Sequence, residues 1–247
     1  MSDRLPFGDD PRTEILRRTQ AALIDAFGRI VRPIDKRRSP EWVLVHGVIG
    51  ARSKTAVSNA STDALLSTYG SWEAVARAPV AELSDRLARQ TFPEQSARRL
   101  KACLEQVVAL RGSVDLRHLS NLPTAEAMVW LEALPGVGRK IAAGVMNTSG
   151  FARSVMVIDS HHRRIMQRMG FVPAKADTAR AYDALMPLLP PEWHAADMDE
   201  HHLLLKKLGQ TFCRPREPRC KNCPVRADCA TGQRKPSSPY QPLSGRR

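Results

Sequence analysis

The sequence of 247 residues has no long apolar run, and this absence excludes a membrane-spanning protein. No stretch approaches the roughly 20 consecutive apolar residues that a helix needs to cross a bilayer. The polar start MSDRLPFGDDPR also lacks the apolar segment of a secretory signal. We therefore expect no membrane association and a cytoplasmic location, next to the nucleoid if the source is bacterial.

Acidic residues are too few to balance the basic ones. Aspartate and glutamate number 25 against 38 lysines and arginines, which leaves a net charge of +13. A polyanion is the partner that such a charge attracts most, so nucleic acid is the first expectation and an anionic membrane surface the second. Because 43% of the residues are hydrophobic, the chain can also bury a substantial core.

Strands and internal repeats are also scarce. Apolar residues recur at spacings of three and four almost everywhere outside the proline- and glycine-rich stretches, which indicates amphipathic helices. The sequence therefore predicts an all-α fold, with 155–158 as the only strand-like run and the polar link 32–40 as a domain boundary. The predicted helices cover residues 15–30, 42–50, 54–69, 71–78, 96–111, 124–134, 160–169, 176–188 and 199–209.

The segment LEALPGVGRK predicts a helical hairpin, in which one helix ends near Leu134 and the next begins near Arg139. Gly136 and Gly138 allow the turn to approach another surface closely, and free amides at the start of the second helix suit a phosphate. Such contacts position DNA without reading its sequence. Gly136, Val137, Gly138 and Arg139 are therefore candidate DNA contacts, and the alternative is a plain connection between packed helices.

Four of the five cysteines are crowded near the C-terminus, with the spacing C-x6-C-x2-C-x5-C. They are Cys213, Cys220, Cys223 and Cys229. In a reducing compartment this crowding favours metal ligation over disulfides. Four cysteine ligands suit a tetrahedral zinc ion or a 4Fe-4S cluster, and unligated thiols are a third possibility. Cys103 lies apart on an apolar helix face and is predicted to be a small buried residue.

Three sequence features in this order, LPGVGRK, VIDSHHRR and the cysteine loop, resemble the endonuclease III family of helix-hairpin-helix DNA glycosylases. The resemblance covers about residues 15–229. It implies two helical subdomains that flank a DNA-binding cleft, with the hairpin in one and a C-terminal 4Fe-4S loop in the other. The predicted parts are a central helical barrel domain at 41–151, an iron–sulfur cluster domain at 13–40 and 152–230, and disordered tails at 1–12 and 231–247.

The resemblance also implies a catalytic pair. The family's nucleophilic lysine follows the hairpin and matches Lys140, and its aspartate matches Asp159. An amine that attacks C1′ of the sugar expels the base and leaves an imine, which then permits β-elimination. A free lysine titrates near 10.4, so we expect burial and a helix N-terminus to lower the pKa of Lys140. Asp159 would relay a proton and stabilise positive charge on the sugar. The alternatives are a solvated lysine and a helix cap.

Two further positions match residues that members of the family insert between the stacked bases of DNA. Where the family has a glutamine that fills the vacated space, this chain has Arg52, which donates hydrogen bonds but cannot accept them. This departure leaves the opposing base and the damaged-base class open. Phe92 aligns with the family's second wedge and can stack on bases or pack in a core. His161 and His162 are candidates for phosphate contact or helix capping.

The resemblance favours the 4Fe-4S cluster over zinc as the cofactor of the cysteine loop. Five basic residues in this loop outnumber two acidic ones, so the excess can offset the cluster's negative charge and face DNA. Lys221 is the candidate DNA contact. The basic residues are Arg214, Arg216, Arg219, Lys221 and Arg226, and the acidic ones are Glu217 and Asp228.

The leading prediction is a monomeric DNA glycosylase and abasic-site lyase that removes oxidised pyrimidines from double-stranded DNA, because Lys140 is present. A monofunctional enzyme for uracil or mismatched thymine, in which water attacks, is the first alternative. A non-catalytic DNA-binding or redox-sensing iron–sulfur protein is the second. Adenine removal is disfavoured, because those relatives carry a non-lysine residue at the nucleophile position and an extra C-terminal domain.

Overall fold

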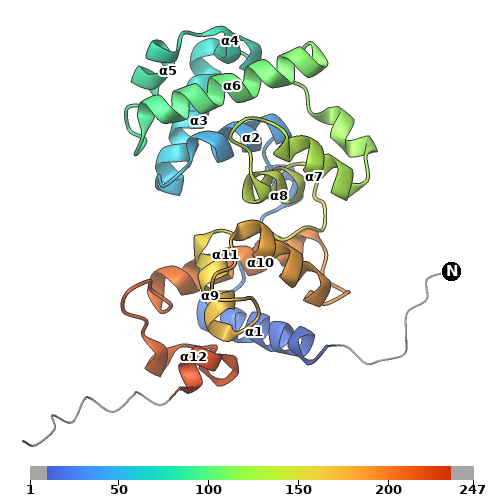
Figure 1. Ribbon diagram of the computed structural model, residues 1–247, viewed down its shortest axis with the longest axis vertical. Helices are drawn as coiled ribbons and strands as arrows, with labels where there is room; N and C mark the ends of the chain where they lie inside the picture. The colour runs from blue at the N-terminus through green and yellow to red at the C-terminus, as the bar shows by residue number, and fades with distance from the viewer. Residues whose placement is uncertain (1–9, 235–247) are drawn as a thin grey trace, which may run out of the picture.

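The computed structural model describes residues 10–234 and is built from helices joined by loops (Figure 1). Within this range there is no strand, only an isolated bridge between Arg38 and Ser149, so the all-α prediction is confirmed. The helices are α1 (Pro11–Phe27), α2 (Pro40–Ile49), α3 (Thr55–Tyr69), α4 (Trp72–Arg77), α5 (Val80–Arg86), α6 (Pro93–Arg111), α7 (Thr124–Glu132), α8 (Arg139–Thr148), α9 (Ser160–Met169), α10 (Thr178–Leu185), α11 (Ala195–Thr211) and α12 (Ala230–Gln233). Single 3-10 turns lie at η1 (Ile34–Lys36), η2 (Arg117–Asn121), η3 (Met186–Leu188), η4 (Cys220–Asn222) and η5 (Arg226–Asp228).

Most predicted helices occur close to their expected bounds, because the caps that the sequence provides are used. Ser39, for example, accepts a hydrogen bond from the amide of Trp42 at 3.2 Å and starts α2. The helices α5 and α12 were not predicted, and both are short, with seven and four residues. No helix among residues 10–234 is long and apolar enough to cross a membrane.

The predicted tails lie mainly outside the described residues. Where they overlap, the structure differs from the prediction, because α1 already begins at Pro11 and α12 continues to Gln233. Asp10 starts α1 by accepting a hydrogen bond from the amide of Arg12 at 2.8 Å.

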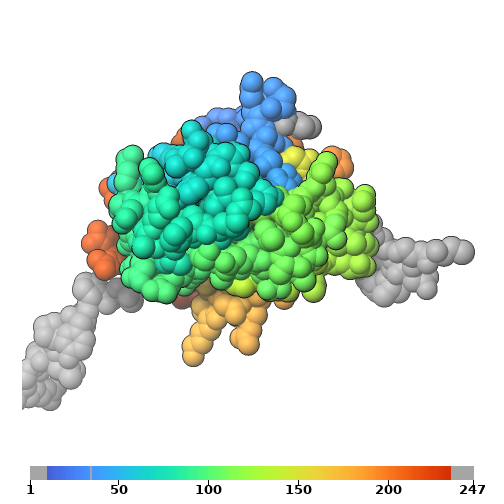
Figure 2. Space-filling view, turned by 90° about the horizontal axis from the view of Figure 1, so that it is seen from above, coloured from blue at the N-terminus to red at the C-terminus, as the bar shows by residue number. Residues whose placement is uncertain are grey.

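The buried apolar residues form two clusters, which we call the upper and the lower core after their places in Figure 1. The upper core gathers buried residues of α2 to α8, and the lower core joins α1 to α9, α10 and α11. Seen from above, the upper end of the molecule is covered by the teal to light green helices, with a blue stretch projecting at one edge (Figure 2). The division into 41–151 and 13–40 with 152–230 stays a prediction, while the upper core draws on residues 43–157 and the lower core on 16–23 and 156–225.

The first helix belongs to the lower core although it is far from it in sequence. The hydroxyl of Thr13 donates to the carbonyl of Leu188 at 2.9 Å, and Arg17 pairs with Glu192 at 2.7 Å. Further along α1, Gln20 accepts from a ring nitrogen of His201 at 2.7 Å. The chain therefore enters and leaves through the lower part, and the upper part is inserted between.

The run Val155–Ile158 was predicted as strand-like, and this prediction is wrong, because the segment forms no strand. Its alternating apolar residues nevertheless have a structural cause. The segment is extended and pairs with no strand. Val155 and Val157 are buried in the upper core, whereas Met156 and Ile158 are buried in the lower core. Because alternate side chains of an extended chain point to opposite sides, one segment supplies both cores and imitates a buried strand.

Truncation of this segment tests its role in stability. Ile158 is 1% exposed, so Ile158→Ala should lower the free energy of unfolding by about 2–5 kcal/mol, through lost burial and a cavity. The measurement is a urea denaturation curve. Val129→Ala serves as control, because Val129 is 70% exposed and should change stability by less than about 0.5 kcal/mol. Equal effects of the two changes would contradict the assignment.

Candidate active site

The predicted helical hairpin is formed by α7, a tight turn and α8. Gly136 has a φ of 77°, a backbone conformation that residues with a Cβ rarely adopt. Gly138 caps α8, and the amides that follow it have no acceptor within the helix. Val137 differs from its prediction as a DNA contact, because its side chain is buried in the upper core and its amide already donates to Leu134 at 3.1 Å.

Arg139 holds the hairpin to the lower part of the molecule. Its guanidinium forms ion pairs with Glu132 of α7 and with Asp183 of α10, the latter at 2.6 Å. It also lies 4.8 Å from the centre of the Tyr182 ring. Both of its carboxylate partners come from the protein, and a contact of Arg139 with DNA stays a prediction.

Lys140 is the second residue of α8 and projects into a cleft. Its side chain is exposed to solvent in that cleft. The protein atoms around the cleft still desolvate the amine and lower the pKa of Lys140, and the charge of Lys206 acts in the same direction. Asp159 raises the pKa but does not outweigh burial. The helix N-terminus also disfavours the ammonium form. The shift has the direction that a nucleophilic amine requires.

Asp159 caps α9, which is the role that the sequence analysis gave as the alternative to catalysis. Its Oδ1 accepts from the amides of His161 and His162 at 2.8 and 2.9 Å. Burial pushes the pKa of Asp159 upward, but its electrostatic interaction with the His202 imidazole and the hydrogen bond from the amide of His162 outweigh burial and lower it. The carboxylate is therefore held in its ionised form and fixed in direction, while it also lines the cleft.

The cleft brings Lys140 and Asp159 together. It has a volume of about 1040 Å³ and is lined by residues of α2, α3, α8 and α11. Its walls carry many more basic than acidic side chains, which suits an anionic ligand. The basic residues are Arg32, Lys36, Arg38, Arg52, Lys54, Lys140 and Lys206, and the acidic ones are Asp159 and Asp199.

Several histidines at this site were missed or misjudged from sequence. His46 and His202 line the cleft from opposite parts of the molecule, and burial lowers the pKa of each to about 4, so both are neutral at pH 7. His162 is 1% exposed and bonds to the carbonyl of Val157, so it is no phosphate contact. An imidazole inside the apolar run VLVHGVIG was the available signal for His46.

Arg52 lines the cleft and lies beside Phe92. The guanidinium carbon of Arg52 is 5.8 Å from the centre of the Phe92 ring, and Phe92 is 41% exposed, which excludes the core-packing alternative. Their loops are joined because the amide of Thr91 donates to the hydroxyl of Ser53 at 2.9 Å. Arg52 itself has a φ of 60°, so its backbone is held in the left-handed region.

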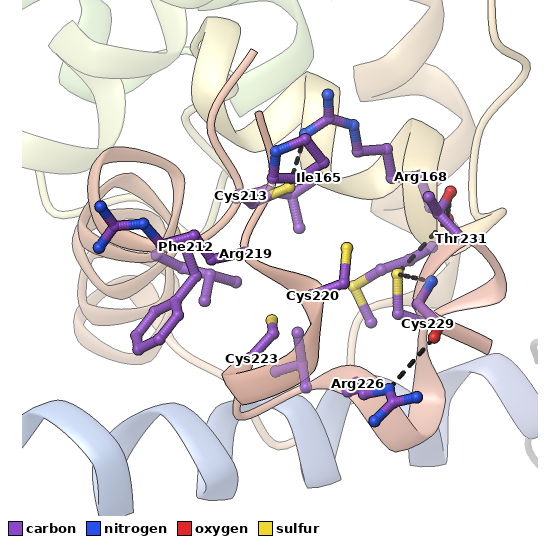
Figure 3. A pocket seen from close by; sticks show the side chains of 15 residues that line it. Ile165, Arg168, Phe212, Cys213, Arg219, Cys220, Cys223, Arg226, Cys229 and Thr231 are labelled. Atoms are coloured by element: carbon purple, nitrogen blue, oxygen red, sulfur yellow. Dashed lines mark hydrogen bonds between the residues drawn. The ribbon is translucent and has the colours of Figure 1, made fainter. Parts of the chain in front are cut away.

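The four clustered cysteines surround one hollow between α9, α11 and α12 (Figure 3). Two of their sulfurs accept hydrogen bonds from the protein. Arg168 donates to Cys213 at 3.2 Å, and the amide of Gly232 donates to Cys229 at 3.4 Å. Among residues 10–234, no three histidine, cysteine, aspartate or glutamate side chains converge as ligands of a single ion. Cys103 is buried elsewhere, in the upper core.

Two arginines of α9 secure the start of the cysteine loop. Arg164 donates to the carbonyl of Cys213 at 2.8 and 3.0 Å, and Arg168 donates to the carbonyl of Arg214 at 2.7 Å. At the other end of the loop, Arg18 of α1 pairs with Asp228 at 2.7 Å. Lys221 is exposed on η4, away from the cleft-lining residues.

The sequence and the fold match known proteins. Residues 45–191 match the family described as "HhH-GPD superfamily base excision DNA repair protein". The chain is 25% identical to endonuclease III of Thermotoga maritima over 195 residues, which cover 78% of this chain and 84% of that protein. It is 28% identical to the transcriptional activator DEMETER of Arabidopsis thaliana over 171 residues, 64% of this chain but 9% of that much longer protein.

Solved structures agree with these similarities. A trapped covalent intermediate of endonuclease III with DNA, in a complex with an estranged adenine, superposes with a TM-score of 0.72 at 22% identity. The match covers 89% of this chain and 96% of that one. At this identity the superposition shows a shared fold, and it confirms the two helical parts with a hairpin that the sequence predicted.

Proposed function

Because the chain belongs to the HhH-GPD superfamily of base excision DNA repair proteins, we propose that it is a DNA glycosylase with abasic-site lyase activity. Its substrates would be damaged pyrimidines, of the oxidised class, in double-stranded DNA. One observation carries this proposal: Lys140 and Asp159 line the same basic cleft. Had their side chains lain on unrelated surfaces, the two could not act on one sugar.

Lys140 would act as the nucleophile. Its lone pair attacks C1′, the electrons of the glycosidic bond leave with the base, and a proton restores the neutral base. Opening of the sugar ring then gives an imine between C1′ and Nζ. Loss of a proton from C2′ expels the 3′ phosphate by β-elimination. Burial favours the first step, since it lowers the pKa of Lys140 and so increases the fraction of free amine.

Asp159 would support departure of the base. Two amide donors hold its carboxylate in one orientation, and its lowered pKa keeps it ionised at pH 7. An ionised carboxylate stabilises the positive charge that develops on the sugar as the glycosidic bond breaks. It can also take the proton that the attacking amine loses.

Basic side chains of the cleft and the amides at the start of α8 would hold DNA phosphates. Arg52 and Phe92 would together fill the space that the extruded nucleotide leaves, since a cation over an exposed ring forms one stacking unit. Gly136 and Gly138 would allow the backbone to approach the phosphate. Lys221 would add a contact outside the cleft.

The cysteine loop fits a 4Fe-4S cluster as its proposed cofactor. Four thiols around one hollow, with N–H donors on two sulfurs, suit a group that takes one cysteine ligand at each of four irons. A single zinc ion would need all four sulfurs about 2.3 Å from one point. When bound, the cluster would cross-link the loop between α11 and α12.

Metal analysis tests this cofactor. We expect about four irons and four sulfides per purified chain. Cys220→Ser should lose most of the iron, because one ligand is removed, whereas Cys103→Ser should keep it, because Cys103 is buried in the upper core. Stoichiometric zinc, or iron that survives in Cys220→Ser but not in Cys103→Ser, would refute the assignment.

Borohydride trapping tests the reaction itself. The probes are duplexes that contain thymine glycol, uracil opposite guanine, thymine opposite guanine, or an abasic site. A lyase gives a covalent adduct together with base release. Base release without an adduct would favour the monofunctional glycosylase, and binding without either would favour the non-catalytic alternative.

A further inference from the structure

The Trp42–His46 pair of α2 forms a flat wall of the cleft that none of the steps above uses. The two rings are nearly parallel, with an interplanar angle of 9° and centroids 5.1 Å apart. Both residues line the cleft. The indole of Trp42 is fixed, because its Nε1 donates to Asp63 at 2.8 Å and the guanidinium of Arg38 lies 4.8 Å from its ring. The wall is therefore preorganised.

This wall lies beside the proposed nucleophile. A Cβ placed on Gly47 would be 2.7 Å from Cγ2 of Ile141, so α2 and α8 pack very closely at this point. His46 and Lys140 directly precede these two residues, and both line the cleft. The positive charge of Lys140 also acts on the imidazole, where it lowers the pKa in the same direction as burial.

The cleft has room for a planar group at this place. Gly144 lines it and has no side chain to fill it. A Cβ placed on Gly144 would meet only Cγ1 of Val43, at 4.0 Å. The space next to Lys140 is therefore bordered by a ring stack on α2 and by bare backbone on α8.

One nitrogen of the His46 imidazole is left without a hydrogen-bond partner among residues 10–234, although Asn59 lies close enough to act on the ring. Its Nε2 is enclosed and has no hydrogen-bond partner in the described part of the chain, which is uncommon for a buried polar atom. Rotation of the imidazole by a half-turn about its Cβ–Cγ bond keeps the ring stacked on Trp42. It exchanges each ring nitrogen with a ring carbon, so a nitrogen can be presented on either edge of the ring. Because the ring is neutral at pH 7, it can both donate and accept a hydrogen bond.

We propose that His46 is a base-recognition residue: the extruded base lies against the Trp42–His46 wall, and the imidazole hydrogen-bonds to the polar edge of that base. The inference rests on the proposed function of the cleft. A neutral ring surface suits a neutral, planar, heteroaromatic ligand. A phosphate of the DNA would instead bind the lysines and arginines of the cleft. The wall is therefore expected to contact the base and not the sugar–phosphate backbone of the DNA.

Separate assays of base release and of Schiff-base formation test this role. His46→Leu introduces an apolar side chain of similar size, which cannot form the hydrogen bond. We expect single-turnover base release to fall about tenfold to hundredfold, on whichever of the thymine glycol, uracil and mismatched thymine duplexes the wild type cleaves fastest. Borohydride trapping on a duplex with a preformed abasic site should stay within about twofold, because that substrate has no base to recognise.

Two further variants make the result specific. His46→Gln retains a hydrogen-bonding side chain and should restore most of the base release. His118→Leu is the matched control, because His118 packs edge-on against Trp130 at 4.7 Å and has unpartnered ring nitrogens, but it does not line the cleft. It should leave both reactions unchanged.

Three outcomes would overturn the proposal. They are base release in His46→Leu equal to wild type, an equal loss of base release and trapping, and no rescue by His46→Gln. Thermal melting of each variant separates these outcomes from unfolding. A wild-type chain that neither releases a base nor forms an adduct would instead refute the proposed function, and this inference with it.

Discussion

Lys140→Ala should form no covalent adduct with DNA and should release the base at least about a thousandfold more slowly than the wild type. Alanine has no amine to attack C1′. The other lysines that line the cleft lie on other elements, so we expect none of them to replace Lys140 at the start of α8. Borohydride trapping and single-turnover base release are the measurements. Lys175→Ala is the control, because Lys175 is an exposed lysine outside the cleft.

The pH dependence of trapping provides a second measurement on the same residue. The reactive form is the free amine, whose fraction rises with pH until the pKa of Lys140 is passed. Because burial lowers that pKa, the rate should level off below pH 10.5, the ordinary value for lysine. A rate that keeps rising as for a solvent lysine, or an adduct that survives in Lys140→Ala, would exclude Lys140 as the nucleophile.

Asp159→Asn should lower base release by about a hundredfold to ten-thousandfold while the fold remains intact. Asparagine caps a helix about as well as aspartate, so the hydrogen bonds to the amides of His161 and His162 can persist. What is lost is the negative charge next to the developing positive charge of the sugar. Trapping on a preformed abasic site should fall less, because no base has to leave.

Asp177→Asn is the matched control for this change. Asp177 caps α10 by accepting from the amide of Arg180 at 2.9 Å, but it does not line the cleft. Both variants should melt within a few degrees of the wild type, and only Asp159→Asn should lose activity. If Asp159→Asn loses stability and activity together, the residue is a helix cap and nothing more.

The helices were predictable because each depends on its own sequence. The apolar period predicted a helix at 42–50, close to the observed α2, Pro40–Ile49, which Ser39 caps. The alternation at Val155–Ile158 was also real, but its cause lies outside the segment. A strand buried on two faces and a connection shared by two cores produce the same sequence pattern, and only the arrangement of the other helices distinguishes them.

The resemblance predicted that Lys140 and Asp159 share a cleft, and the structure places both in one because each is fixed by the turn or cap of its own segment. The site was not predictable where distant residues decide. Arg139 is predicted to contact phosphate, and its ion pair with Asp183 depends on the packing of α10 on α8. His46 lies beside Lys140 only because Gly47 permits the close approach of α2 and α8. The close packing of α2 on α8 cannot be predicted from the sequence of either helix alone.

The placement of α1 in the lower part has a consequence for how the chain folds during synthesis. Leu16 and Leu23 leave the ribosome early, yet their packing partners on α9 and α11 are made much later. The helices of the upper part, α2 to α8, are complete in the meantime and can bury their own apolar faces. A nascent chain therefore carries an unshielded apolar helix ahead of a finished upper half, and this interval is when chaperones have a surface to hold.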